Sequence, residues 1–166
     1  ETSTVDSWDE ATAFCSPETR ATIVRGVCLQ GVEHNLNVSG ACRTGVQEIA
    51  VVSSRGTRAY HAGTFAGLII NTMSESSAGW AKGGGWRLSD LDTEALGKEA
   101  VSKAVEGRNP VAVDPGRYPV VLDTYAVDDI LEALSMYGLG AQAVQGGRSW
   151  MNELIGPKAR TPAGKT

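Results

Sequence analysis

Apolar residues recur at helical spacing in two stretches of the first two thirds of the chain. The first stretch follows Ser16, where a serine N-cap, a proline and a glutamate make a helix start, and it ends at Asn35 or Asn37. The second follows the capping residues 89–92 and stops at Gly107. The pattern therefore predicts two amphipathic helices.

A third helix has the clearest apolar stripe of the chain. Residues 126–137 place valine, isoleucine, leucine and tyrosine on one face, with two aspartates in the first turn. Gly138 closes this helix, and a short helix is expected at residues 141–145.

Shorter segments rich in β-branched and aromatic residues alternate with glycine- and serine-containing turns, which is typical of antiparallel strands. The predicted strands are residues 38–42, 47–52, 57–61, 65–73, 78–82 and 118–122. Residues 83–85, three glycines, are expected to form a loop. The fold class is therefore α/β of the α+β type: an antiparallel β-meander of about five to six strands packed with three main helices.

The polar ends of the chain suggest the domain limits. Residues 16–156 are expected to form a single α/β domain, and 166 residues suffice for a core. Residues 1–15 are interpreted as a flexible lead-in with Trp8 and Phe14 as anchors, and residues 157–166 as a loose tail. Because position 1 is glutamate, we expect a trimmed or processed piece.

Composition narrows the class of protein. Hydrophobic residues make up 42% and the net charge is -4, which indicates a folded chain and argues against general nucleic-acid binding. No apolar run approaches the roughly 18 residues of a membrane span. The odd count and wide spacing of Cys15, Cys28 and Cys42 favour reduced thiols in a cytoplasmic protein, with one disulfide as the alternative.

The sequence supplies no recognisable catalytic or metal motif. His34 and His61 have no partner at ligand spacing, so no metal site and no cofactor are expected in this chain. Residues 138–143 match a dinucleotide loop only superficially, because they follow a helix instead of a strand. No serine has the surroundings of a nucleophile, so no catalytic residue is assigned.

Two features remain open between functional and structural interpretations. Asp128, Asp129 and Glu132 form a carboxylate cluster capable of acid–base chemistry, although first-turn acids commonly just complement the helix dipole. Gly147, Arg148, Ser149 and Trp150 are candidates for contact with a partner or a peptide, since arginine beside an aromatic residue is frequent at interfaces. The alternative for the latter is a tight turn with its tryptophan in the core.

Four segments stand in a fixed order along the chain: EIAVVSSRG (residues 48–56), DLDTEALG (90–97), PGRYPVVL (115–122) and AVQGGRS (143–149). Together they resemble segments of the TldD/PmbA family of peptidases, also called modulators of DNA gyrase. The similarity runs from about Gly45 to Gly156. It implies the later part of an amino-terminal α/β domain of a longer protein.

The resemblance also implies a branch of the family. Metal-bearing members carry a HExxxH zinc motif on the helix that follows residues 118–122. Here Glu132, Ala133 and Tyr137 stand at those three positions. The chain therefore looks like the non-metal, PmbA/TldE-like branch, which works beside a zinc-bearing TldD-like partner.

The leading hypothesis is a non-catalytic PmbA/TldE-like subunit fragment of a TldD–TldE-type zinc-dependent peptidase complex acting on unfolded or modified peptides. Its partners would be a TldD-like metallopeptidase, in a heterodimer, and an extended peptide, with neither nucleic acid nor a membrane. The alternative is a stand-alone protein- or peptide-binding scaffold domain without protease activity. An enzyme that uses the carboxylate cluster is a third hypothesis.

Overall fold

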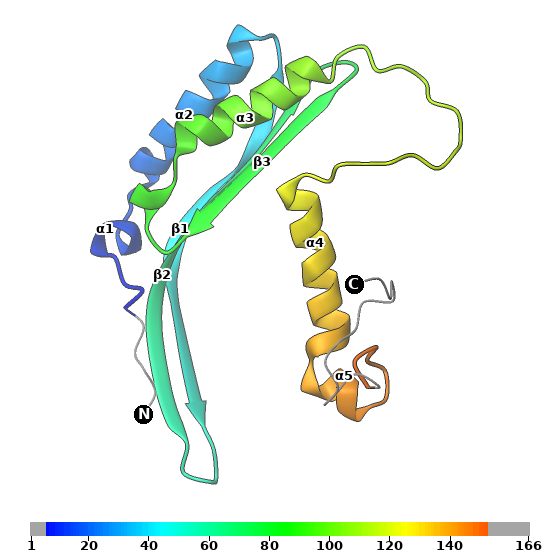
Figure 1. Cartoon of the computed structure of the whole chain (residues 1–166). Coiled ribbons are helices and arrows are strands. Elements are labelled where there is room, and N and C mark those ends of the chain that lie inside the picture. Colours follow the sequence, from blue (N-terminus) through cyan, green and yellow to red (C-terminus); the bar gives the residue numbers. More distant parts are fainter. Residues whose placement is uncertain (1–5, 153–166) are drawn as a thin grey trace, which may run out of the picture. The chain divides into compact units, whose positions relative to one another are not determined.

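The computed structural model describes residues 6–152, which fall into two units that divide between Val113 and Asp114. The first unit contains a three-stranded antiparallel sheet in the order β1-β2-β3 (Figure 1). Its strands are β1 (Asn37–Val52), β2 (Arg58–Met73) and β3 (Ala78–Gly85). The predicted α+β class with an antiparallel meander is confirmed.

The predicted number of strands was wrong, because the strands are fewer and longer. β1 joins the predicted segments 38–42 and 47–52 across Gly45, and β2 joins 57–61 and 65–73 across Gly63. Gly45 lies opposite Phe65 in the register, and a methyl group added there would come within 2.8 Å of Cζ of the Phe65 ring. An aromatic side chain thus covers the glycine, which keeps the strand continuous.

The predicted loop at residues 83–85 and the predicted strand at residues 118–122 were also wrong. Residues 83–85 extend β3, because their backbones pair with β2 from Ala66 to Leu68, so they are not a loop. Residues 118–122 form no strand: Pro119 lacks an N–H donor, and Val121 is fully exposed. Within residues 6–152 the sheet consists of β1, β2 and β3, and the run is not part of it.

Two helices cover one face of the sheet (Figure 1). In α2 (Pro17–Glu33) the side chain of the N-cap Ser16 accepts from the Thr19 amide, and Asn35 beyond its end has a φ of 55°. In α3 (Thr93–Glu106) the carboxylate of Asp92 accepts from the Ala95 amide. Both helices begin and end as the sequence predicts.

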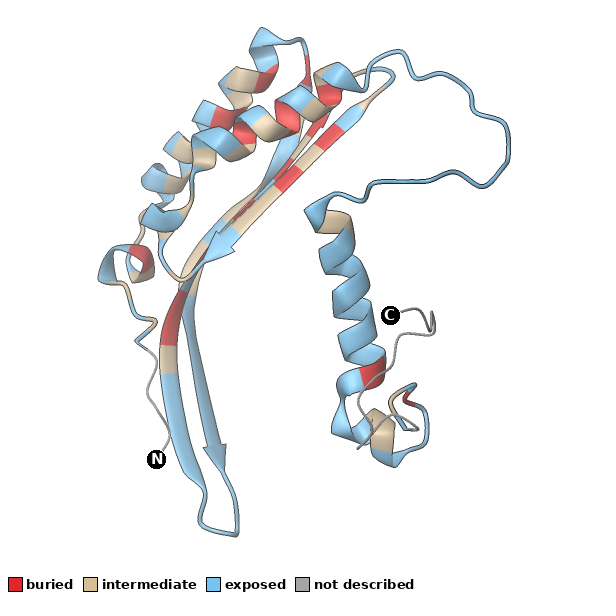
Figure 2. Cartoon of the chain, in the orientation of Figure 1, coloured by how far each residue is buried: buried red, intermediate tan, exposed pale blue. Residues whose placement is uncertain are grey.

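The main core lies between these helices and the sheet (Figure 2). It is built from side chains of α2, β2, β3 and α3, namely Val27, Leu68, Ile70, Ala81 and Ala100. Burial of this apolar surface supplies about 25 cal/mol per Å² and holds the layers together.

The second half of the predicted lead-in contains a short helix, α1 (Glu10–Ala13). The Thr12 hydroxyl is completely buried, donates to the Asp9 carboxylate at 2.6 Å and accepts from the Leu88 amide at 2.8 Å. This bond to Thr12 holds the pKa of the Asp9 carboxyl below its ordinary value. Trp8 and Phe14 are exposed, so Thr12 is the anchor and the aromatic residues are not.

Beyond the end of β3 the paired strands β1 and β2 continue as a two-stranded arm, defined here as residues 46–61 (Figure 2). Every residue of the arm is exposed. At its base the Thr64 amide donates to the Ser7 carbonyl at 2.9 Å, so the segment before α1 braces the edge of β2.

The second unit consists of helices in sequence. α4 (Thr124–Leu134) starts at the N-cap Asp123, a π-helix follows at Ser135–Leu139, and α5 is Ala141–Gln145. The predicted third helix and the short helix after it are confirmed, although α4 starts earlier and its end changes to π geometry. The predicted tail lies outside the described residues. No helix within residues 6–152 combines the length and apolarity needed to cross a bilayer.

Replacing Gly79 by alanine is expected to destabilise the first unit. The added methyl group would overlap the carbonyl oxygen of Ala100 and lie 2.7 Å from the amide nitrogen of Ala104. Because both atoms are backbone of α3, the helix must move off the sheet. We expect the free energy of unfolding, measured in urea, to fall by about 2–4 kcal/mol.

Gly84→Ala is the matched control in the same strand. A methyl group there meets only the Ala66 carbonyl at 3.6 Å, an ordinary contact. It should change the free energy of unfolding by less than about 0.5 kcal/mol. Equal effects of the two substitutions would contradict the close packing of α3 on β3.

Candidate functional site

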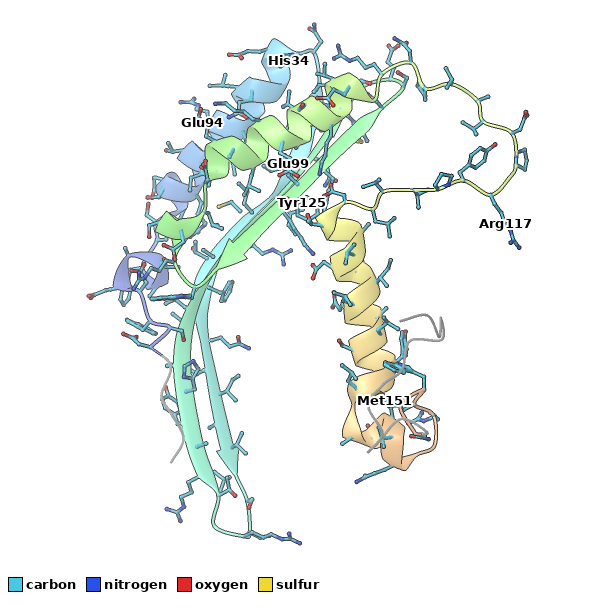
Figure 3. All side chains as sticks on the ribbon, in the orientation of Figure 1. His34, Glu94, Glu99, Arg117, Tyr125 and Met151 are labelled. Carbon is cyan, nitrogen blue, oxygen red and sulfur yellow. The ribbon has the colours of Figure 1, made fainter. Side chains whose placement is uncertain are left out.

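The predicted contact segment, Gly147 to Trp150, forms a turn after α5 in which Gly147 has a φ of 68°. The buried Ser149 hydroxyl donates to the Gly138 carbonyl at 2.5 Å and accepts from the Met151 amide at 2.9 Å. Met151 lies at the end of this turn (Figure 3). Ser149 is therefore a structural residue that fastens the turn to the π-helix.

The other side chains of this segment differ in exposure. The Trp150 indole lies directly over Gly138, where an added methyl group would overlap its Nε1, yet 49% of the residue is exposed. Arg148 is exposed and its amide donates to the Ala143 carbonyl at 2.9 Å. Within this segment Gly147, Arg148 and part of Trp150 are exposed, and Ser149 is buried.

The three positions of the zinc motif lie at the end of α4. Glu132 and Ala133 belong to α4, Tyr137 belongs to the π-helix, and all three are exposed. Ala133 has no donor atom for a metal. Among residues 6–152 no three His, Cys, Asp or Glu side chains gather so that they could hold a metal ion, and this holds for Asp128, Asp129 and Glu132 as well.

The two histidines are far apart in the fold. His34 caps the end of α2, where Figure 3 labels it, and His61 lies on the arm in β2. The Nε2 atom of His61 is hydrogen-bonded to the Ser7 hydroxyl at 2.9 Å. A serine beside a histidine resembles a nucleophile and its base, but this pair is exposed and has no third orienting group in the described contacts. It braces the lead-in.

A surface that the sequence did not predict is the side of the sheet opposite α2 and α3. We call it the open face and define it by alternate residues of the strands that point away from the helices. Its larger side chains are Arg43, Phe65, Ile69, Met73, Trp80 and Lys82. Phe65 is 42% and Met73 44% exposed, and the Lys82 ammonium lies 5.6 Å from the centre of the Trp80 ring.

The chemistry of the open face is unusual for a solvated sheet. Its positions on β1 from 37 to 47, on β2 from 65 to 73 and on β3 from 78 to 84 include no aspartate or glutamate. A sheet face that meets only water is ordinarily polar. Aromatic and aliphatic side chains beside arginine and lysine are typical of a surface that contacts another polypeptide.

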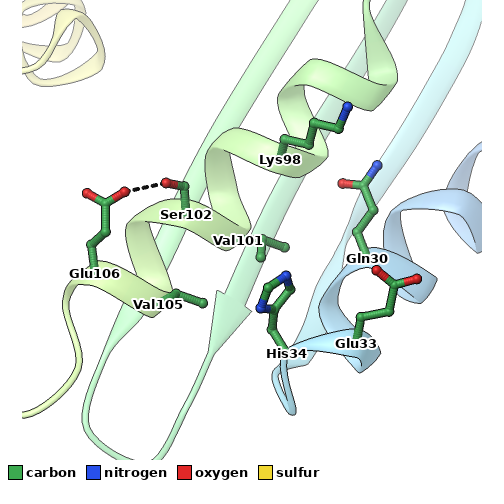
Figure 4. Close-up of a pocket in the computed structure, with 8 residues that line it drawn as sticks. All are labelled: Gln30, Glu33, His34, Lys98, Val101, Ser102, Val105 and Glu106. Carbon is green, nitrogen blue, oxygen red and sulfur yellow. Dashed lines mark hydrogen bonds between the residues drawn. The ribbon is translucent and has the colours of Figure 1, made fainter.

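A groove lies between α2 and α3 in the first unit (Figure 4). Val101 and Val105 form its floor, and charged side chains line its rim. The Lys98 ammonium pairs with Glu94 at 2.6 Å, which raises the pKa of this lysine. The Ser102 hydroxyl donates to Glu106 one turn along, so both are surface contacts within one helix.

Comparison with protein families identifies the family of this chain. The family described as the PmbA/TldA metallopeptidase central domain matches residues 18–108, which is more than half of the chain. The chain therefore belongs to the TldD/PmbA family. The matched segment begins before Gly45, ends at the end of the first unit's helices, and is described as central, whereas the sequence suggested an amino-terminal domain.

A solved structure agrees with this assignment at the level of the fold. A protein from Thermotoga maritima, described as a candidate modulator of a DNA gyrase, has a TM-score of 0.77 and 17% sequence identity. The match covers 91% of this chain but 36% of the Thermotoga protein, so the present chain spans little more than a third of its length. The comparison with curated proteins gave no match.

Gly138→Ala should disturb the predicted contact segment, because the new methyl group displaces the Trp150 indole from the π-helix. We expect faster amide hydrogen exchange at Met151, measured by mass spectrometry, as the bond to Ser149 loosens. Gly140→Ala is the control, since nothing lies within 4 Å of a methyl group there. Unchanged exchange at Met151 in Gly138→Ala would contradict this packing.

Proposed function

We propose that the chain is a non-catalytic, PmbA/TldE-like subunit, or part of one, in a cytoplasmic TldD–TldE-type zinc-dependent peptidase complex. The catalytic zinc belongs to a TldD-like partner in a heterodimer. The complex acts on unfolded or modified peptides. This chain helps to bind the partner and to enclose the extended peptide.

The observation that carries the proposal is the set of residues at the zinc-motif positions. A peptidase metal site needs imidazole or carboxylate ligands that hold the ion and leave one position open for water. Ala133 replaces the catalytic glutamate with a methyl group, and Tyr137 replaces the second histidine with a phenol. This chain therefore lacks the side chains that would generate a metal-bound hydroxide at these positions.

The open face supports the association with a partner. It combines exposed apolar area with the exposed Arg43 and includes no acid, a composition suited to a surface that carries apolar and acidic groups. The exposed Phe65 and Ile69 supply area for desolvation, and Arg43 supplies charge that orients the approach.

The free edge of β1 supports the capture of a peptide. Among residues 6–152 β1 pairs with β2 on one side only, so within this part of the chain its other edge presents backbone donors and acceptors over the length of Asn37–Val52. An extended peptide can add to such an edge through backbone hydrogen bonds that tolerate many side chains. Such binding suits unfolded peptides, which share an extended backbone and differ in their side chains.

A second candidate is a stand-alone scaffold domain that binds a protein or a peptide and has no protease partner. The self-contained core of the first unit favours it, because the helices and the sheet pack without any other element. The two hypotheses differ in solution: a scaffold stays monomeric beside a TldD-like peptidase, and a subunit forms a complex with it.

The direct test is peptide cleavage by a zinc-bearing TldD-like partner with and without this chain. We expect the rate of cleavage of an unfolded peptide to rise by about tenfold or more when the chain is added, which corresponds to about 1.4 kcal/mol. The chain alone should cleave nothing and bind no stoichiometric zinc. Zinc binding and cleavage by the chain alone would refute the proposal.

Arg43→Glu places an acid on the open face and should weaken association with the partner by about tenfold, measured by titration calorimetry. Arg25→Glu is the control, because Arg25 is exposed on α2 on the opposite side of the sheet. Equal losses in both variants would mean that net charge, and not the open face, governs association.

A further inference from the structure

Cys15 and Cys42 belong to neighbouring parts of the first unit although they are far apart in the sequence. Cys15 lies in the turn between α1 and α2, outside both helices. Cys42 lies on β1, on the face covered by the helices, and packs against the main core. Both thiols are free and half-buried.

Arg20 fastens these two places together. Its Nη1 atom donates to the Cys15 carbonyl at 2.7 Å and to the Thr44 hydroxyl at 3.1 Å. Thr44 follows Cys42 by two residues, so both side chains point to the same side of β1. The Nη1 atom of Arg20 thus links the turn that contains Cys15 to Thr44 of β1, two residues from Cys42.

The electrostatics of the two thiols agree with this arrangement. Burial raises the pKa of the Cys42 thiol, and the nearby charge of Cys15 raises it further, while Arg20 lowers it. Cys15 lines a groove with Phe14 and Thr19, through which a small molecule can reach its thiol. Cys28 lines a different groove between α2 and β1.

We propose that Cys15 and Cys42 are a reactive thiol pair that a small-molecule disulfide converts to an intramolecular disulfide. The Cys15 thiolate attacks one sulfur of the oxidant, so a mixed disulfide forms and one small thiol leaves with the electron pair. The Cys42 thiolate then attacks the Cys15 sulfur and expels the second small thiol. Two protein thiols are oxidised, and one small-molecule disulfide is reduced to two thiols.

The surroundings favour closure of this bond. Arg20 holds the Cys15 backbone beside Thr44 of β1, two residues from Cys42. Closure requires the turn to bring the two Cα atoms within about 7 Å of each other. Cys15 belongs to no helix or strand, so it can adjust without breaking one. The bond would tie the turn before α2 to the edge strand. The inference does not depend on the proposed function.

The test uses the full chain and oxidised glutathione, followed by alkylation of the remaining thiols and mass spectrometry of the intact protein and its peptides. We expect the protein to lose two hydrogen atoms, a cross-linked pair of peptides to contain Cys15 and Cys42, and Cys28 to be alkylated. A cross-link that includes Cys28, or a glutathione adduct on Cys15 that never resolves, would overturn the proposal.

Single substitutions supply the controls. Cys28→Ser should form the same disulfide at the same rate, within about twofold, because Cys28 takes no part. Cys42→Ser should stop at the mixed disulfide on Cys15, and Cys15→Ser should form no intramolecular bond. Circular dichroism of each reduced variant checks its fold. A disulfide that persists in Cys15→Ser would overturn the assignment of the pair.

Discussion

The arrangement of the first unit depends on the close packing of α3 against β3. Gly79 lets the backbone of α3 approach the strand, and the completely buried Ala81 and Ala100 take up little space between them. The Thr72 hydroxyl donates to the Ala100 carbonyl at 2.7 Å, so the helix is bonded to the sheet as well as packed on it. Because this contact commits one face of the sheet to the core, the open face lies outside that core.

Local signals predicted the helices well, because the side chains that start and stop a helix are adjacent to it in the sequence. Ser16 and Asp92 cap α2 and α3 as their residue types suggest. The strands were harder to predict. Gly45 and Gly63 resemble turn residues, and their place within long strands depends on cross-strand neighbours such as Phe65 that the sequence does not reveal.

The surfaces of the candidate site were also hard to predict, because they depend on contacts between residues that are distant in the sequence. The alternation that defines the open face emerges only when β1 and β2 are taken as continuous strands, because breaking them hides which residues share a side. Likewise, the bond from Ser149 to Gly138 joins two turns that the sequence treats separately. Ala133, which stands at the glutamate position of the zinc motif, could be interpreted from the sequence alone. An alanine has no carboxylate, whatever the fold around it.

The arm of residues 46–61 has a mechanical consequence. An isolated pair of strands has little stability of its own, and here the pair extends past the third strand with all its side chains exposed. Hydrogen bonds from Ser7 to Thr64 and His61 support it at the base. The arm is therefore attached to the rest of the first unit through the strands β1 and β2 and the hydrogen bonds of Ser7. A force applied at its tip is transmitted to the core by bending of this strand pair.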